Sequence, residues 1–304
     1  MNTSLFGSKG LIGSAIRKRL NRTEIDLNCI DFDWGKRQSY LNNEINLVDF
    51  IVDPDRLKHI ELLAQSKNII LSLGITNVLS NENEVNDEAK LIKHIINDIS
   101  KVIPRDASII LITSGGGIFN SSSHTNDESS YDFRQTPYAT MKLGLEDYLN
   151  NIAFQNKVRS LIIRLPNVYG EEQNINKGQG LVSKIVNAHR LGTTIEVTKN
   201  LDSQKHYILN HDVADGIYKY LQILETNKLN NVSLIHMIQQ NSIYSIRNLI
   251  ELSESLWGKS LSIKHTEELP YDTVVLSTRY TECILPENQN AVKNFLKNQR
   301  DKHG

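Results

Sequence analysis

The sequence has few cysteines, almost no net charge and no long hydrophobic run. Its 304 residues include two cysteines, Cys29 and Cys283, and 34 basic against 35 acidic residues, for a net charge of −1. Two isolated cysteines form no disulfide framework, and balanced charge suggests neither a nucleic-acid surface nor a membrane surface. No run approaches the roughly 20 apolar residues that cross a bilayer, and no signal peptide precedes the first predicted strand. We expect a cytoplasmic protein without nucleic-acid or membrane partners.

Metal chemistry is also not indicated. The nine histidines are scattered, and none joins a cysteine in a cluster with metal-ligand spacing. We therefore predict no metal site. The length is sufficient for one main domain with a sizeable core and a smaller lobe.

Three glycines follow the first predicted strand. Gly7, Gly10 and Gly13 repeat at every third position before a helical segment. Glycine permits a tight turn, and the N-terminus of the helix that follows attracts a phosphate. A second strand over 25–30 ends at Asp31, about 20 residues beyond the glycines, where dinucleotide-binding folds place the acid that binds the adenosine ribose. The order of these features predicts a dinucleotide site.

The charges near this site favour two different cofactors. Asp31 would accept hydrogen bonds from the ribose and repel a 2′-phosphate, which favours NAD. Lys9 precedes the second glycine, and Lys36 and Arg37 follow the second strand, where cations would pair with a 2′-phosphate. Solvated surface charge would also account for these cations. We predict NAD, with NADP as the alternative.

Strand and helix patterns alternate through the first half of the chain. An amphipathic helix is predicted over 85–103, because its apolar residues recur on one helix face. Short apolar runs predict further strands, which fall at residues 44–48, 68–73, 108–112 and 160–164. Apolar strands separated by helices favour an α/β fold, a Rossmann-type doubly wound parallel sheet. Beyond residue 165 the pattern weakens to a helix over 180–189 and a short strand over 195–197.

Tyr138 and Lys142 lie four positions apart, which places them on one face of a helix. A tyrosine hydroxyl ordinarily ionises near pH 10, and a neighbouring ammonium favours the ionised form. Such a phenol is usable as a general acid/base nearer neutral pH. Both residue types are common on helix surfaces, so the pair carries weight only together with the glycines.

Together these motifs resemble the extended short-chain dehydrogenase/reductase family, in its NAD-dependent nucleotide-sugar epimerase/dehydratase branch. The resemblance covers nearly the whole chain. Besides the glycines, Asp31 and Pro137-Tyr138-x-x-x-Lys142, it rests on motifs in a shared order: Asn97, Thr113-Ser114-Gly-Gly, Arg164-Leu-Pro-Asn167-Val-Tyr-Gly170, Gly178-x-Gly180 and Tyr207-Ile-Leu-Asn-His-Asp212-Val-Ala214. It implies a dinucleotide-binding domain at 1–165, to which 205–228 return, and a smaller C-terminal substrate-binding lobe at 166–204 and 229–304.

The resemblance implies roles for the catalytic groups. Tyr138 would move a proton to or from a sugar hydroxyl, and Lys142 would hold the nicotinamide ribose. Relatives add a Ser or Thr hydroxyl after the fifth strand. Alignment on the downstream motif places that position on Gly115, whereas counting back from Tyr138 places it on Ser114 or Thr113. We favour Ser114, with Thr113 second, although both hydroxyls are also suited to cap the strand end.

Contacts to cofactor and substrate are implied in the same way. Asn46 stands where relatives usually carry an aspartate near the adenine, and Lys205 where they usually carry an arginine near the diphosphate. The implied cofactor contacts are Gly7, Lys9, Gly10, Leu11, Ile12, Gly13, Asp31, Asn46, Leu47, Leu73, Asn97, Tyr138, Lys142 and Leu165. The implied substrate contacts are Asn167, Gly180, Leu181, Lys205 and Glu268.

Two reactions fit these residues. A nucleotide-sugar 4-epimerase, as used in surface-polysaccharide synthesis, would oxidise C4 transiently with Tyr138 as acid/base. A reductase would instead transfer hydride from NAD(P)H to a nucleotide-linked 4-keto sugar. Asp31 favours the epimerase and Lys9 the reductase, while glycines replace the Asp-Glu pair of the family's 4,6-dehydratases. A non-catalytic dinucleotide-binding protein is a third alternative, which Gly115 favours. We predict the epimerase, with a homodimer built on the 85–103 and Tyr138 helices.

Overall fold

The computed structural model describes residues 1–120, 125–171, 173, 180–226, 233–238, 242–265, 272–280, 285–286, 288 and 290–303. Its largest element is a six-stranded parallel sheet in the order β10-β6-β4-β3-β1-β2. The strands are β1 (Asn2–Phe6), β2 (Asp26–Ile30), β3 (Asn68–Leu71), β4 (Ser108–Ser114), β6 (Arg159–Leu165) and β10 (Ser233–Met237). The chain runs outward from β1 to β2 and then returns to β3, so the order reverses beside β1. Ligands bind at such a switch point, outside the carboxyl ends of the strands.

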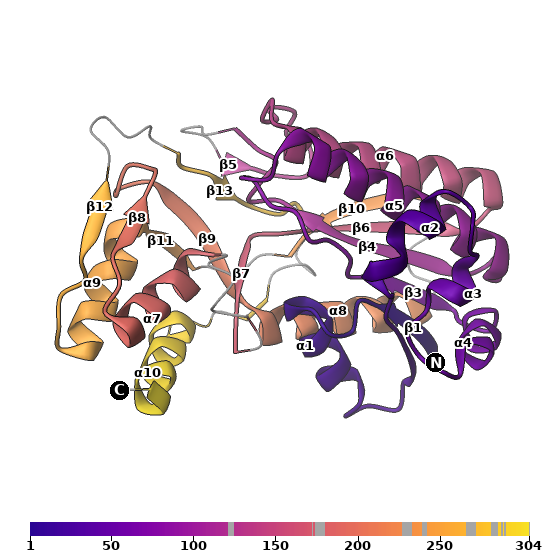
Figure 1. Ribbon diagram of the computed structural model, residues 1–304, viewed down its shortest axis with the longest axis horizontal. Coiled ribbons are helices and arrows are strands. Elements are labelled where there is room, and N and C mark those ends of the chain that lie inside the picture. Colours follow the sequence, from indigo (N-terminus) through magenta and orange to yellow (C-terminus); the bar gives the residue numbers. More distant parts are fainter. Residues whose placement is uncertain are drawn as a thin grey trace.

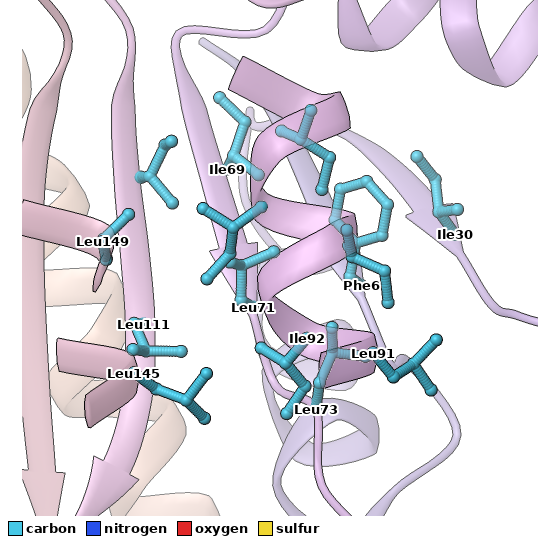
Figure 2. Close-up of a cluster of buried hydrophobic side chains, with 14 of the residues drawn as sticks. Phe6, Ile30, Ile69, Leu71, Leu73, Leu91, Ile92, Leu111, Leu145 and Leu149 are labelled. Carbon is cyan, nitrogen blue, oxygen red and sulfur yellow. The ribbon is translucent and has the colours of Figure 1, made fainter. Parts of the chain in front are cut away.

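Helices cover both faces of this sheet (Figure 1). The long helices α5 (Glu82–Val102) and α6 (Pro137–Asn156) lie on one face, and α1 (Leu11–Leu20) and α8 (Asn210–Glu225) on the other. Figure 2 shows strand residues such as Leu71 and Leu111 packed against Leu91 of α5 and Leu145 of α6. Burying one such side chain contributes roughly 1.5–3 kcal/mol. The predicted doubly wound parallel fold is confirmed.

The prediction of the α5 helix is confirmed, and its start is set by a capping box. The Asn81 side chain accepts a hydrogen bond from the Glu84 N–H, and the Glu84 carboxylate accepts one from the Asn81 N–H. These two bonds satisfy N–H groups that have no partner inside the helix. The buried face runs from Val85 to Ile99 at helical spacing and contains one carboxylate, that of Glu88.

Smaller elements connect β2 to β3, and their buried residues join the core on the α5 face of the sheet. They are the 3₁₀ turn at Trp34–Lys36, α2 (Arg37–Leu41), α3 (Leu47–Phe50) and α4 (Arg56–Leu63). The strand predicted over 44–48 is wrong, because α3 begins there. The Asn46 side chain accepts a hydrogen bond from the Asp49 N–H, and this cap outweighs the weak alternating pattern of a short apolar run.

The second half of the chain builds a smaller lobe with its own core (Figure 1). Its elements are β7 (Asn167–Tyr169), α7 (Leu181–Leu191), β8 (Ile195–Val197), β9 (Gln204–Leu209), β11 (Ile243–Ser245), α9 (Ile246–Trp257), β12 (Ile263–His265) and α10 (Ala291–His303). A short parallel pair joins β5 (Thr125–Asn126) to β13 (Val275–Leu276). One strand in the range predicted for the lobe, β10, pairs with β6 of the main sheet. Among the described residues no helix is both long and apolar enough to span a membrane.

Candidate active site

Glycines shape the turn between β1 and α1. Gly7 has φ +81°, a conformation that other residues rarely adopt. A Cβ atom on Gly13 would lie 2.0 Å from the Gly7 carbonyl oxygen, so the turn and the helix touch at backbone distance. Gly10 is the N-cap of α1 and has no side chain that could bond the first N–H groups of the helix. The turn therefore offers a phosphate those N–H groups.

Asp31 follows the carboxyl end of β2, next to this turn. Its carboxylate accepts a hydrogen bond of 2.8 Å from the Ser8 hydroxyl, and the Lys9 ammonium lies 3.9 Å from the same oxygen. Lys9 is largely exposed. One carboxylate oxygen is thus held by the turn, while the acid stands where a ribose would be bound.

Tyr138 and Lys142 lie in the first turns of α6. Thr136 caps this helix by accepting a hydrogen bond from the Ala139 N–H, and Pro137 occupies the first position, where its missing N–H is not needed. The Lys142 ammonium is buried and lies 5.3 Å from the centre of the Tyr138 ring. The two residues are therefore brought together as their spacing predicts.

Ser114 ends β4 on the other side of this pair. Its hydroxyl accepts a hydrogen bond of 3.0 Å from the Gly117 N–H. A Cβ atom on Gly117 would lie 2.9 Å from both the Ser114 hydroxyl and a ring carbon of Tyr138. Gly117 therefore allows the serine hydroxyl and the tyrosine ring to approach one point from two sides.

Thr113 is directed elsewhere. It pairs in register with Arg164 of β6, and its buried side chain lies against the Glu146 carboxylate. Arg164 and Glu146 form a buried ion pair with the atoms 2.6 Å apart. Burial raises the pKa of Glu146, although Arg164 acts in the opposite direction. Of the two hydroxyls considered, Ser114 is the one that neighbours Tyr138.

Asn167 begins β7 and faces the glycines that follow β4. Its amide donates a hydrogen bond of 3.0 Å to the carbonyl oxygen of His206 in β9. A Cβ atom on Gly116 would lie 3.3 Å from the Asn167 amide nitrogen, so glycine allows this close approach. Asn167 thus links the end of β4 to the smaller lobe.

Lys205 belongs to a cluster of cations around one buried carboxylate. The Asp272 carboxylate bonds to Arg134 and lies 2.9 Å from the Lys205 ammonium and 3.8 Å from that of Lys199. Burial alone would raise the pKa of Asp272, but Lys205 and Arg134 outweigh it and hold the pKa below its ordinary value. Burial lowers the pKa of Lys205, with Asp272 acting against it. Three cations face one carboxylate, so the cluster has surplus positive charge.

The remaining predicted substrate contacts lie at the start of α7 and beyond. Gly180 is the N-cap of α7 with φ +82°, and Leu181 is the first residue of the helix and packs on the core of the lobe. Gly178 and Glu268 lie outside the described residues.

Comparison with known proteins identifies the family of this chain. The sequence profile of the NAD dependent epimerase/dehydratase family matches residues 4–234. This chain belongs to that family. It is therefore an enzyme that uses NAD, and the predicted resemblance is confirmed.

Individual relatives of the family are distant. A dTDP-4-dehydro-6-deoxyglucose reductase of Escherichia coli is 23% identical over 220 residues, 70% of this chain and 70% of the relative. The structure of MoeE5 in complex with UDP-glucose and NAD matches with a TM-score of 0.77 at 13% identity, over 99% of both chains. A UDP-glucuronic acid 4-epimerase from Bacillus cereus, in complex with UDP-glucuronic acid and NAD, matches with a TM-score of 0.75 at 15% identity, over 99% of this chain and 98% of the other. At such identities these structures show the fold.

The residues at the switch point fit the family's cofactor. The glycine turn leaves no room for a Cβ at Gly7 or Gly13, so only glycine permits its tight path, and turns of this kind let a pyrophosphate approach the backbone. Gly7 also approaches Leu73, because a Cβ there would lie 3.4 Å from the Leu73 side chain. Leu165 closes the end of β6, and its carbonyl oxygen accepts hydrogen bonds from Gly115 and Gly116. Leu11 and Ile12 form the first turn of α1, directly after the glycine turn.

Three predicted cofactor contacts lie farther from this turn. Asn46 caps α3, and Leu47, the first residue of that helix, is buried. Asn97 lies near the C-terminal end of α5, where its amide donates to the Asp98 carboxylate. Nine residues separate Asn97 from Glu88, or about 13 Å along the helix axis. The structure brings Glu88, and not Asn97, to Lys142.

Glu88 is a site residue that the sequence did not reveal. Its carboxylate lies 3.3 Å from the Lys142 ammonium, and both side chains are more than nine-tenths buried. A signal was present in the sequence, because Glu88 falls on the apolar face of an otherwise regular amphipathic helix, between Val85 and Leu91. Buried carboxylates require partners, and this one finds its partner on another helix.

Proposed function

We propose that this protein is an NAD-dependent nucleotide-sugar 4-epimerase. The observation that carries the proposal is the meeting of the Tyr138 phenol, the Lys142 ammonium and the Ser114 hydroxyl beside the glycine turn. An acid/base, a fixed positive charge and a hydrogen-bonding hydroxyl are the groups that alcohol oxidation next to a nicotinamide requires.

The protein's own residues would handle the proton. Tyr138 in its ionised form would accept the proton of the sugar C4 hydroxyl, and Lys142 would stabilise the phenolate through its charge. Ser114 would hydrogen-bond the same sugar oxygen as it becomes a ketone. A bound NAD would supply the acceptor for the C4 hydride. In an epimerase the hydride would return to the opposite face of C4 after the sugar has turned, and Tyr138 would return the proton to the C4 oxygen, so NAD would be regenerated.

The features of the smaller lobe support a nucleotide-linked substrate. Arg134, Lys199 and Lys205 surround Asp272 with surplus positive charge, which suits a diphosphate. Asn167 lies between β9, the strand that carries Lys205, and the glycines next to Tyr138. A diphosphate at the cluster and a sugar at Tyr138 are consistent with the UDP-sugars bound by MoeE5 and the Bacillus cereus epimerase.

A reductase of a nucleotide-linked 4-keto sugar is the second candidate. The Escherichia coli relative is named as a reductase of this kind. The same proton transfer would then run once, from Tyr138 to the nascent alkoxide, with NAD(P)H consumed. The exposed Lys9 beside Asp31 also suits an exchanging cofactor, since it offers a cation to a 2′-phosphate.

The two candidates differ in what happens to the hydride. We expect the enzyme to interconvert a UDP-hexose and its C4 epimer with a catalytic amount of NAD and no net NADH formation. In deuterium oxide, C4 of the product should carry no deuterium, because the substrate's own hydride is returned. Product analysis by NMR and the absorbance of NADH measure both quantities.

Other results would overturn the epimerase. Stoichiometric consumption of NADH with a UDP- or dTDP-4-keto-hexose, and transfer of deuterium from labelled NADH to C4, would identify the reductase. Turnover of neither substrate class would contradict both candidates and favour a protein that binds the cofactor without this chemistry.

We also propose that two copies associate through the outer faces of α5 and α6. These helices lie side by side on one face of the sheet (Figure 1). The outer side of α6 carries Phe154, which is 77% exposed, and the half-buried ring of Tyr148. We expect light scattering to give twice the 34.6 kDa of one chain, and Phe154→Asp to shift it toward one chain. A single-chain mass for the unmodified protein would contradict the dimer.

A further inference from the structure

Glu88 carries a charge into a part of the protein that is otherwise apolar. The residue is 3% exposed and lies on the face of α5 that packs against the sheet. Burying a carboxylate in such a place is costly unless the charge is paired and each oxygen accepts hydrogen bonds. The contacts of Glu88 therefore indicate what the residue is for.

One oxygen of Glu88 holds a loop. It accepts hydrogen bonds of 2.6 Å from the Ile75 N–H and 2.7 Å from the Thr76 N–H. These residues follow β3, at the carboxyl edge of the sheet where the cofactor would lie. Two backbone donors on one carboxylate oxygen fix the path of this loop.

The other oxygen of Glu88 holds Lys142. The ammonium lies 3.3 Å away and its side chain is 8% exposed. Gly74 lies beside both groups, with φ +147°, and a Cβ atom on it would lie 3.2 Å from the carboxylate and 3.4 Å from the ammonium. The carboxylate, the ammonium and the Gly74 backbone therefore pack in direct contact, and only glycine allows this without a shift.

A lysine side chain has four carbons and loses considerable rotamer freedom when it is fixed. An ammonium has three N–H donors, of which Glu88 takes one. The remaining donors are left for a cofactor and for the space beside the Tyr138 ring, 5.3 Å away. A carboxylate anchored by two backbone N–H groups is a rigid point against which Lys142 can be held.

We infer that Glu88 is a positioning residue. It fixes the Lys142 ammonium and the Gly74–Thr76 backbone against each other, next to where the nicotinamide would bind. This inference rests on the proposed function and on the role in holding the nicotinamide ribose that the family resemblance implies for Lys142. Glu88 acts through Lys142 and itself touches neither the cofactor nor the sugar.

Glu88→Gln separates this role from simple packing. The glutamine oxygen can still accept from the two loop N–H groups, but its amide then turns two donors toward the ammonium. Lys142 is displaced, and a displacement of about 1 Å in a catalytic group can reduce the rate about 10²-fold. We expect NADH to bind about tenfold more weakly and kcat to fall about 10–100-fold, while the KM for the sugar nucleotide stays within about twofold. Fluorescence titration of the full-length chain with NADH measures the affinity without any sugar present.

Glu146→Gln is the matched control. Glu146 is as deeply buried as Glu88 and forms a comparable ion pair, but with Arg164 of β6 and not with Lys142, which lies one helical turn before it on α6. It should lower the melting temperature, as Glu88→Gln does, but leave NADH affinity and kcat unchanged when both are measured well below melting. Equal weakening of NADH binding by both variants would show general destabilisation and overturn the inference.

A double-mutant cycle tests whether Glu88 acts through Lys142. In a Lys142→Met background, Glu88→Gln should change the NADH affinity by less than about twofold. A full tenfold effect in that background, or wild-type NADH binding by Glu88→Gln alone, would overturn the inference. A protein that binds NADH with this pattern but converts no nucleotide sugar would leave the inference standing and refute the proposed function.

Discussion

Replacing Tyr138 by phenylalanine is expected to lower kcat about 10²–10⁴-fold, the usual contribution of a positioned acid/base. The Lys142 ammonium lies 5.3 Å from the centre of the Tyr138 ring, and a phenyl ring keeps this contact. The fold and the cofactor site should therefore be retained. The affinity for NADH should therefore stay within about twofold of wild type. Steady-state kinetics with the sugar nucleotide and fluorescence titration with NADH measure the two quantities.

Tyr148 provides the control for this substitution. Tyr148 lies on the same helix as Tyr138. The Lys93 ammonium lies 5.5 Å from the centre of its ring, so both tyrosines contact a lysine ammonium through the ring. Tyr148→Phe should leave kcat unchanged. Normal turnover by Tyr138→Phe would show that another group moves the proton and would remove the central residue from the proposed mechanism.

Gly13→Ala is expected to abolish measurable NADH binding and to destabilise the fold. The added Cβ would lie 2.0 Å from the Gly7 carbonyl oxygen, which is backbone and cannot turn aside as a side chain can. Overpacking of this kind typically costs about 1–3 kcal/mol, and here the displaced group is the phosphate cradle itself. Urea unfolding gives the free energy of unfolding, and NADH titration gives the affinity.

The same substitution at Gly144 should have the opposite effect on stability. Gly144 lies within α6, and apart from its chain neighbours and the nearby backbone of its own helix, no atom of the described residues would come within 4 Å of an added Cβ. Alanine is favoured over glycine inside a helix by roughly 0.5–1 kcal/mol, so Gly144→Ala should stabilise the protein and leave NADH affinity unchanged. Tight NADH binding by Gly13→Ala would contradict the phosphate cradle.

Short-range patterns gave most of the fold. The strands β3, β4 and β6 were predictable because burial on both faces leaves a continuous apolar run. The α5 helix was predictable because burial on one face leaves a periodic pattern. The strand predicted over 44–48 failed because three apolar residues in a short segment fit strand and helix alike. The Asn46 cap then decided for a helix.

The sequence by itself determined the glycine turn, the acid after β2 and the Tyr138–Lys142 pair, since each depends on spacing within one local element. It left open whether Thr113 or Ser114 meets Tyr138. Packing against the Glu146–Arg164 ion pair takes Thr113 to one side of the strand end, and this leaves Ser114 next to Tyr138.

Only the tertiary structure decided the partners of Lys142 and Lys205. Glu88 lies 54 positions from Lys142, and Asp272 lies 67 positions from Lys205, yet each carboxylate directly contacts its ammonium. No local periodicity links residues so far apart. Such pairs form because folding removes both charges from water, and each buried charge must then be matched by one that the chain brings from elsewhere.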